Sequence, residues 1–185
     1  MAYIKTIPPE AAEGRLGEIY ENLEKTRGKI AEVHKIHSLN PEVLVAHMEL
    51  YMTIMFGKSP LKRYQREMLG VVASAANRCA YCVNHHEQAL LAYWKDAVRC
   101  RQLSSDRSSV DLAEEDRLLC DLADKLTRNE TSDYSADIRV LQEAGLDDRA
   151  ILDAVQVIAY FNFVNRMVLG LGVTFNEEEI KGYKY

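Results

Sequence analysis

The stretch from residue 67 to residue 86 contains the residue types that thiol redox chemistry needs. Cys79 and Cys82 form a Cys-x-x-Cys pair, and His86 follows the second thiol by four residues. Glu67 precedes the pair by twelve residues. A thiolate can attack a peroxide, a second thiol can resolve the oxidised product, and an imidazole oriented by a carboxylate can accept the thiol proton. The stretch therefore predicts redox catalysis by side chains, and we expect no cofactor.

The spacing also predicts a role for each side chain. Cys82 is the predicted nucleophile because His86 lies one helical turn after it. Cys82 would attack the peroxide oxygen and become a sulfenic acid, and Cys79 would condense with it to a disulfide. His86 would take the Cys82 proton, and Glu67 would orient the imidazole. His85 lies one step around the same helix and is a second candidate for the base.

This site requires a break between two helices near Asn77. Asn77 is the predicted N-cap of a helix that begins near Cys79 and runs to about Leu103. The thiols would then lie in its first turn, where free N–H groups and the helix dipole favour thiolates. Within one straight helix a twelve-residue gap spans roughly 18 Å, too far for Glu67 to assist His86. We therefore predict a hairpin in which two helices pack side by side.

The rest of the chain has the pattern of a helical scaffold. Apolar residues recur at helical spacing, polar caps precede the segments, and glycines follow several of them. The predicted helices cover residues 10–27, 41–57, a segment opened by 59–60, 110–128, 135–144 and 149–169, with polar loops at 101–109 and 129–133 and a polar tail at 177–185. We predict an all-α fold, a bundle of about six to eight helices, in a single domain spanning residues 1–185.

Bulk properties exclude several classes of function. The chain has 185 residues, of which 48% are hydrophobic, and a net charge of −5. This balance argues against nonspecific nucleic-acid binding. We expect no membrane segment and no signal peptide, because no apolar run has the required length. A cytoplasmic location follows, where thiols stay reduced and a close cysteine pair indicates redox or metal chemistry.

Two further groups of polar residues could bind a ligand or join helices. His34 and His37 have a spacing that would allow a metal pair, but no cysteine or carboxylate lies at ligand spacing. We expect them to face solvent or to make local hydrogen bonds. Asn162, Asn165 and Arg166 interrupt a strongly apolar helix, and we predict a network that joins helices or subunits in preference to contact with a substrate.

The positions of Glu67, Cys79, Cys82 and His86 resemble the Glu-x11-Cys-x2-Cys-x3-His signature of alkyl hydroperoxidase D-like proteins, in the carboxymuconolactone decarboxylase-like superfamily. The segment 79–86 is similar to the core of the peroxidase-related branch of that superfamily. The resemblance implies a helical bundle that assembles into homo-oligomers. It also implies that the second cysteine is peroxidatic and the first resolving, with the glutamate and histidine in the proton relay.

These implications describe a thiol-dependent peroxidase with an antioxidant role. Its substrate would be a hydroperoxide, and an external dithiol of lipoyl or thioredoxin type would reduce the disulfide again. Tyr81 departs from alkyl hydroperoxidase D proper, which has a histidine directly before the second cysteine. A phenol with a pKa near 10 is a poor proton shuttle at neutral pH, so we expect slow peroxide turnover or a different thiol exchange. The peroxidase-related branch shares this tyrosine.

Other interpretations of the same residues remain open. Cys79, Cys82 and His86 could bind zinc, with Glu67 as the fourth ligand. By analogy within the superfamily the protein could decarboxylate a lactone, although that branch does not rely on the cysteine pair. A helical oligomer without enzymatic activity would leave the four-residue match as a coincidence.

Overall fold

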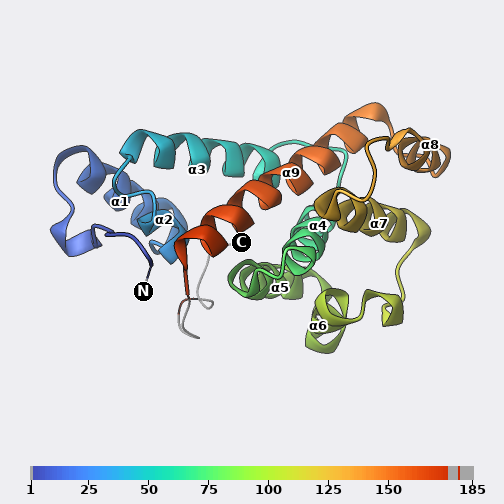
Figure 1. The fold of residues 1–185 in the computed structure, drawn as a ribbon, viewed down its shortest axis with the longest axis horizontal. Coiled ribbons are helices and arrows are strands. Elements are labelled where there is room, and N and C mark those ends of the chain that lie inside the picture. Colours follow the sequence, from blue (N-terminus) through green and yellow to red (C-terminus); the bar gives the residue numbers. More distant parts are fainter. Residues whose placement is uncertain (1, 175–178, 180–185) are drawn as a thin grey trace.

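The computed structural model describes residues 2–174 and residue 179, and every regular element in this part of the chain is a helix (Figure 1). The α-helices are α1 (Gly14–Arg27), α2 (Glu32–Lys35), α3 (Pro41–Phe56), α4 (Arg63–Ala76), α5 (Ala80–Trp94), α6 (Ala97–Ser105), α7 (Glu114–Arg128), α8 (Ser135–Glu143) and α9 (Asp148–Leu171), with 3-10 helices η1 (Pro9–Ala11) and η2 (Arg107–Ser109). The predicted all-α bundle is confirmed. The polar tail predicted at 177–185 lies, except for Glu179, outside the described residues.

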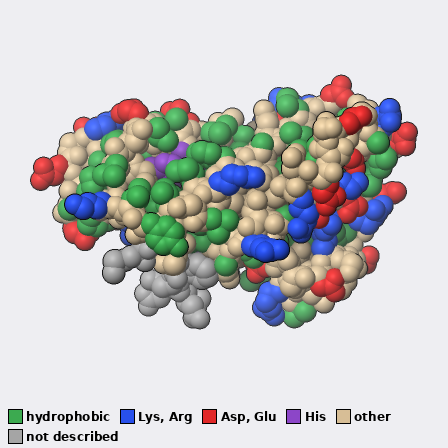
Figure 2. Space-filling model, viewed as in Figure 1, with side chains coloured by type: hydrophobic (Ala, Val, Ile, Leu, Met, Phe, Trp, Pro, Cys, Tyr) green, Lys and Arg blue, Asp and Glu red, His purple; other side chains and the backbone are tan. Residues whose placement is uncertain are grey.

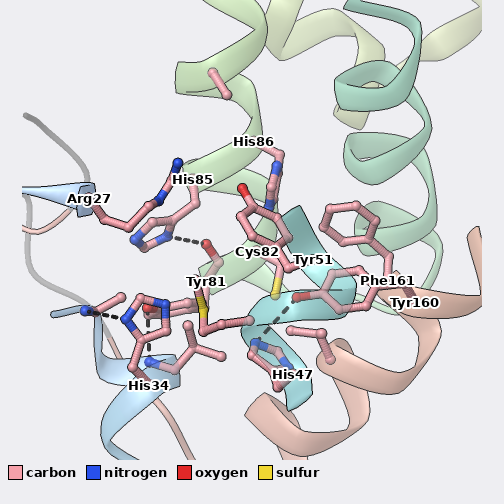
Figure 3. Close-up of a pocket in the computed structure, with 15 residues that line it drawn as sticks. Arg27, His34, His47, Tyr51, Tyr81, Cys82, His85, His86, Tyr160 and Phe161 are labelled. Carbon is pink, nitrogen blue, oxygen red and sulfur yellow. Dashed lines mark hydrogen bonds between the residues drawn. The ribbon is translucent and has the colours of Figure 1, made fainter. Parts of the chain in front are cut away.

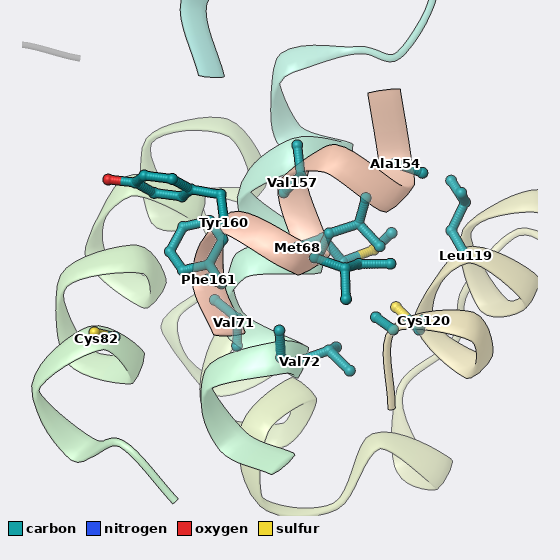
Figure 4. Close-up of a cluster of buried hydrophobic side chains, with 14 of the residues drawn as sticks. Met68, Val71, Val72, Cys82, Leu119, Cys120, Ala154, Val157, Tyr160 and Phe161 are labelled. Carbon is teal, nitrogen blue, oxygen red and sulfur yellow. The ribbon is translucent and has the colours of Figure 1, made fainter. Parts of the chain in front are cut away.

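α9 is the central helix of the fold. It runs diagonally through the molecule in Figure 1, and it packs against α3, α4 and α7. Its buried side chains include Val157 and Phe161, which face Met68 of α4 in the hydrophobic core (Figure 4). Phe161 packs directly on the α4 backbone at Gly70, where an added Cβ would lie 2.7 Å from the ring. This contact holds α4, which carries Glu67, at a fixed distance from α9.

A smaller hydrophobic cluster fixes α1 against α3. The predicted apolar stripe of α1 is buried, and it packs with Leu44 of α3; its members are Leu16, Ile19, Tyr20 and Leu23. Gly28 ends α1 in the left-handed conformation with a φ of 86°, which glycine adopts without strain. The cluster thereby places Arg27, the last residue of α1, beside the centre of the molecule.

Helix boundaries differ from the prediction around the thiol helix. α5 ends at Trp94, Lys95 is left-handed with a φ of 54°, and Asp96 caps α6 by accepting two backbone N–H groups. The predicted helix to Leu103 is therefore two helices, and part of the predicted loop at 101–109 is helical. Continuous apolar spacing hid this break, because an aspartate N-cap can redirect the chain without glycine or proline.

Two other boundaries were not predicted. α2 is a short helix in a segment with weak periodicity. α4 begins at Arg63, not at residue 60, because Gln65 Oε1 accepts the Lys62 N–H at 2.8 Å and completes the first turn there. Ser59 instead donates to Asp153 of α9 at 2.6 Å. The additional α2 and the division of the thiol helix give nine α-helices in the part of the chain that the structure describes, one more than the predicted range of six to eight.

α9 is the one described helix that is long and apolar enough to span a membrane, by length and composition alone. Its buried face belongs to the core described above, which accounts for its apolar composition. On the face drawn in Figure 2, charged side chains of both signs gather over α7 and α8. Ion pairs such as Arg128–Asp124 and Lys125–Asp137 lie in this region.

Candidate active site

The turn between α4 and α5 builds the site. Asn77 is the C-cap of α4, and Arg78 is left-handed with a φ of 57°. Cys79 is then the N-cap of α5, and its N–H donates to Ser74 O at 2.9 Å. The predicted break and the side-by-side packing of the two helices are confirmed. The prediction that Asn77 caps the thiol helix is wrong, because the chain uses two further residues to reverse direction.

Glu67 is fully buried and links α4 to α5. His86 Nδ1 donates to Glu67 Oε2 at 2.6 Å, and Oε1 of the same carboxylate pairs with Arg63, one turn earlier on α4. A buried carboxylate needs partners of this kind to offset its loss of hydration. Because Nδ1 of His86 holds the proton that points to Glu67, Nε2 is the ring nitrogen that can accept another proton.

The two thiols lie together at the start of α5, and both are free and buried. The pKa of Cys79 is lowered, first by a hydrogen bond from the Cys82 thiol and then by the backbone N–H groups of Cys82 and Tyr81, against the opposing effect of burial. The pKa of Cys82 is raised well above that of an ordinary thiol, by its hydrogen bond to Cys79 and by burial. The first negative charge of the pair therefore belongs to Cys79, whereas the sequence predicted that the helix start would favour both thiolates.

A pocket of about 80 Å³ opens beside Cys82 (Figure 3). Cys82 lines it and Cys79 does not, so Cys82 is the thiol that a small molecule in the pocket can reach. The wall is mostly apolar and aromatic and comes from five helices; it includes Met48, Tyr51, Tyr81, His85, His86, Ala89, Tyr160, Phe161 and Val164. A volume of this size holds several water molecules or a small organic group.

Tyr81 and His85 lie against Glu179, on the other side of the thiol helix from Glu67. Tyr81 Oη donates to Glu179 Oε1 at 2.6 Å, and His85 Nε2 is 3.6 Å from the same oxygen. His85 Nδ1 donates to Tyr81 O at 2.7 Å, and the two rings stack with centroids 4.2 Å apart. Unlike His86, His85 therefore has no described contact with Glu67, although it also lines the pocket.

The polar residues of α9 form the predicted network between helices. Asn77 Nδ2 donates to Asn162 Oδ1 at 2.9 Å and to Asn165 Oδ1 at 3.0 Å, and Asn165 Nδ2 donates to Ser74 Oγ at 3.1 Å. Arg166 donates to Asn162 O at 2.8 Å and is exposed. Asn165 is fully buried and also hydrogen-bonds the cysteine pair, which lowers the pKa of Cys79. The sequence identified these residues but not this contact with the thiols.

His34, His37 and His47 are buried, so His34 and His37 do not face solvent, whereas the expected local hydrogen bond is present at His34. His34 Nδ1 accepts the Ala31 N–H at 3.1 Å, and burial lowers the pKa of His34 to about 3. Burial lowers the pKa of His47 to about 4, and its Nε2 lies 3.3 Å from Tyr160 Oη. Among the described residues no three His, Cys, Asp or Glu side chains are grouped as metal ligands.

Comparison with known proteins agrees with the resemblance seen in the sequence. The model of the carboxymuconolactone decarboxylase family matches residues 41–100, which include the α4–α5 hairpin and both thiols. An uncharacterized peroxidase-related protein from Silicibacter sp. TM1040 is 29% identical, with a TM-score of 0.83 over 96% of this chain and 91% of that one. No curated protein sequence matches the chain.

Two further solved structures share the fold. An uncharacterized peroxidase-related protein from Ralstonia eutropha JMP134, described as an alkylhydroperoxidase core, is 24% identical, with a TM-score of 0.86 over 97% of this chain and 94% of that one. The debrominase Bmp8 is 16% identical, with a TM-score of 0.78 over 97% of this chain and 98% of that one. The family model and the Silicibacter structure thus support the resemblance to the alkyl hydroperoxidase D-like and carboxymuconolactone decarboxylase-like superfamily that the four-residue signature predicts.

Proposed function

We propose that the protein is a thiol-dependent peroxidase that reduces a small hydroperoxide with the Cys79–Cys82 pair. The observation that carries the proposal is the arrangement around Cys82. This thiol lines an apolar pocket, its sulfur is hydrogen-bonded to a second thiol, and His86, which the buried Glu67 holds, lines the same pocket. A nucleophile, a base with an orienting carboxylate and a resolving thiol are the groups that this reaction requires.

In the proposed first step, Cys82 attacks the distal oxygen of the hydroperoxide. Its raised pKa means that the thiol needs a base, and His86 Nε2 accepts the proton as the sulfur–oxygen bond forms. The oxygen–oxygen bond breaks, Cys82 becomes a sulfenic acid, and the alkoxide leaves. The imidazolium, held by Glu67, returns the proton to the alkoxide, which departs as the alcohol.

In the second step, Cys79 attacks the sulfenic sulfur of Cys82. The lowered pKa of Cys79 suits this role, because it makes a thiolate at Cys79 easier to form. The disulfide closes, and the hydroxide that leaves takes a proton from solvent and becomes water. An external dithiol of lipoyl or thioredoxin type then reduces the disulfide, and it is oxidised in turn. We place this cycle in the cytoplasm, where reduced thiols are available, and propose that the protein works as a homo-oligomer.

Sulfenic-acid trapping tests the assignment of the two thiols. With one equivalent of hydroperoxide and dimedone, the Cys79→Ser variant should accumulate the trapped sulfenate at Cys82, whereas wild type should close to a disulfide. The Cys82→Ser variant should consume no peroxide and trap nothing. Cys100→Ser is the matched control, because Cys100 is buried outside the pocket and burial raises its pKa to about 11. Trapping at Cys79 in the Cys82→Ser variant would overturn the assignment.

Decarboxylation of a lactone remains the alternative that the family allows. The thiols distinguish the two reactions, because the decarboxylase interpretation gives the cysteine pair no role. Activity on a carboxylated lactone that survives in the Cys79→Ser/Cys82→Ser double variant, together with no peroxide consumption by wild type, would favour the alternative.

A further inference from the structure

The pocket beside Cys82 contains a buried cation that has no described counter-charge. Arg27 is 9% exposed and lines the pocket. Its guanidinium lies over the rings of Phe56 and Tyr51, with its carbon 4.9 and 5.7 Å from their centroids. Within residues 2–174 and 179, no carboxylate or other hydrogen-bond acceptor pairs with it. Burying a charge without a partner destabilises the fold, so a buried, unpaired guanidinium at this position suggests a binding role.

A second arginine beside the same aromatic rings, Arg63, differs from Arg27 in having a carboxylate partner. Arg63 also lies over the Phe56 ring, with its guanidinium carbon 3.8 Å from the centroid. That cation is paired with the buried carboxylate of Glu67. The chain thus provides a carboxylate for one of two neighbouring arginines and leaves the other facing the pocket.

Two features of the fold make the position of Arg27 tolerable in the empty pocket. Arg27 is the last residue of α1, where the helix carbonyls carry partial negative charge. The aromatic rings below the guanidinium add a cation–π attraction. Neither feature supplies an ionic acceptor, so the planar fork of N–H donors stays available for one.

We propose that Arg27 binds the carboxylate of the substrate, and that the substrate is a small organic hydroperoxide that carries this carboxylate. The inference rests on the proposed peroxidase function. The carboxylate would pair with Arg27 at one wall of the pocket, and the apolar body would lie against Tyr51 and the other aromatic side chains (Figure 3). The hydroperoxide group would then reach Cys82. Because the pocket has a volume of only about 80 Å³ and is open on one side, we expect a substrate with a short apolar body.

A matched pair of hydroperoxides tests the charge requirement. The probes are 3-hydroperoxy-3-methylbutanoate and its primary amide, which have nearly the same shape. Wild type should oxidise its thiols at least about tenfold faster with the acid, the effect expected for one hydrogen bond to a charged group. Arg27→Gln should lose this preference, mainly through a lower rate with the acid, and Arg27→Lys should recover part of the preference because it keeps the charge.

The control substitution is Arg15→Gln, which removes the same charge from α1 at an exposed site paired with Glu42. It should leave the preference unchanged. Equal rates with both probes in wild type, or an equal loss of both rates in Arg27→Gln, would overturn the inference.

Binding without turnover separates this inference from the proposed function. The probe is the unreactive alcohol 3-hydroxy-3-methylbutanoate, titrated by calorimetry into the Cys82→Ser variant with and without Arg27→Gln. Binding that depends on Arg27 would support the carboxylate site even if wild type reduced no peroxide. If the protein reduces neutral hydroperoxides but does not bind the alcohol, the carboxylate site alone is overturned. If inorganic phosphate displaces the alcohol and binds more tightly, the choice of a carboxylate is overturned.

Discussion

Replacing Glu67 with glutamine would remove the charge of a fully buried carboxylate while nearly keeping its shape. Two groups depend on this charge, His86 through its Nδ1 and Arg63 through its guanidinium. Nε and Nη1 of Arg63 are buried and already lack a hydrogen-bond partner among the described residues. The substitution would therefore leave a buried cation without compensation.

The expected loss of stability follows from this geometry. Removing one partner of a buried ion pair costs about 3–5 kcal/mol, and glutamine can keep one hydrogen bond, so we expect about 3 kcal/mol for Glu67→Gln. At 2–4 °C per kcal/mol for a chain of this size, the melting temperature should fall by about 6–12 °C. The exposed Glu18→Gln is the control and should change stability by less than about 0.5 kcal/mol.

A double-mutant cycle identifies the source of the loss. If an uncompensated Arg63 is the cause, Arg63→Met should restore part of the stability that Glu67→Gln removes, with a coupling of about 1–3 kcal/mol. Peroxide consumption should fall about 10–100-fold in Glu67→Gln, because His86 is still present as the base but loses the carboxylate that orients its ring. Unfolding by urea and peroxide kinetics measure the two effects. Stability within 1 kcal/mol of wild type together with an unchanged rate would refute the reasoning.

Three further predictions concern the thiols, a buried histidine and the core. In Cys82→Ala the pKa of Cys79 should rise, because it loses the hydrogen bond that contributes most to its lowered value; ultraviolet titration of the thiolate measures this, and a lower pKa would contradict it. The pKa of His34 is about 3 in the folded protein, so its contribution is complete above pH 6.5 and declines as the unfolded chain binds a proton below that pH. The loss should reach about 2 kcal/mol at pH 5, and His34→Asn should reduce the pH dependence of unfolding by about one proton. Gly70→Ala should destabilise the protein by about 1–3 kcal/mol, because its Cβ would meet the Phe161 ring; unfolding by urea checks this, and an unchanged midpoint would contradict it.

The sequence predicted the parts of the site that depend on local spacing. The distance argument required a hairpin to bring Glu67 to His86, and the structure contains that hairpin and that hydrogen bond. The buried stripe of α1 and the network around Asn162 and Asn165 also followed from helical periodicity and from polar residues in an apolar helix.

The different pKa shifts of the two thiols depend on the exact residue at which α5 begins. Cys79 occupies the N-cap because the turn contains two residues after α4, and this register decides which thiol receives the backbone N–H groups. Helical periodicity has no such precision at the end of a helix. The opposite pKa shifts of Cys79 and Cys82, and the exposure of Cys82 alone to the pocket, could therefore not be predicted from the sequence.

The pocket was missed for a different reason. Its wall combines α1, α2, α3, α5 and α9, and Arg27 and His47 contribute to it from segments that look like ordinary amphipathic helices. In the sequence Arg27 is a cation in the last turn of a helix, which is a common and stabilising position. Only the packing of α1 on α3 shows that this cation is buried beside Cys82.

The central claim is that Cys79 and Cys82 form a redox couple, and thiol titration with intact mass tests it most directly. The reduced protein has four cysteines. After one equivalent of hydroperoxide, two thiols should be lost, the mass should fall by two hydrogens, and peptide mapping should place the disulfide between Cys79 and Cys82. Four titratable thiols with an unchanged mass, or a disulfide that involves Cys100 or Cys120, would contradict the account.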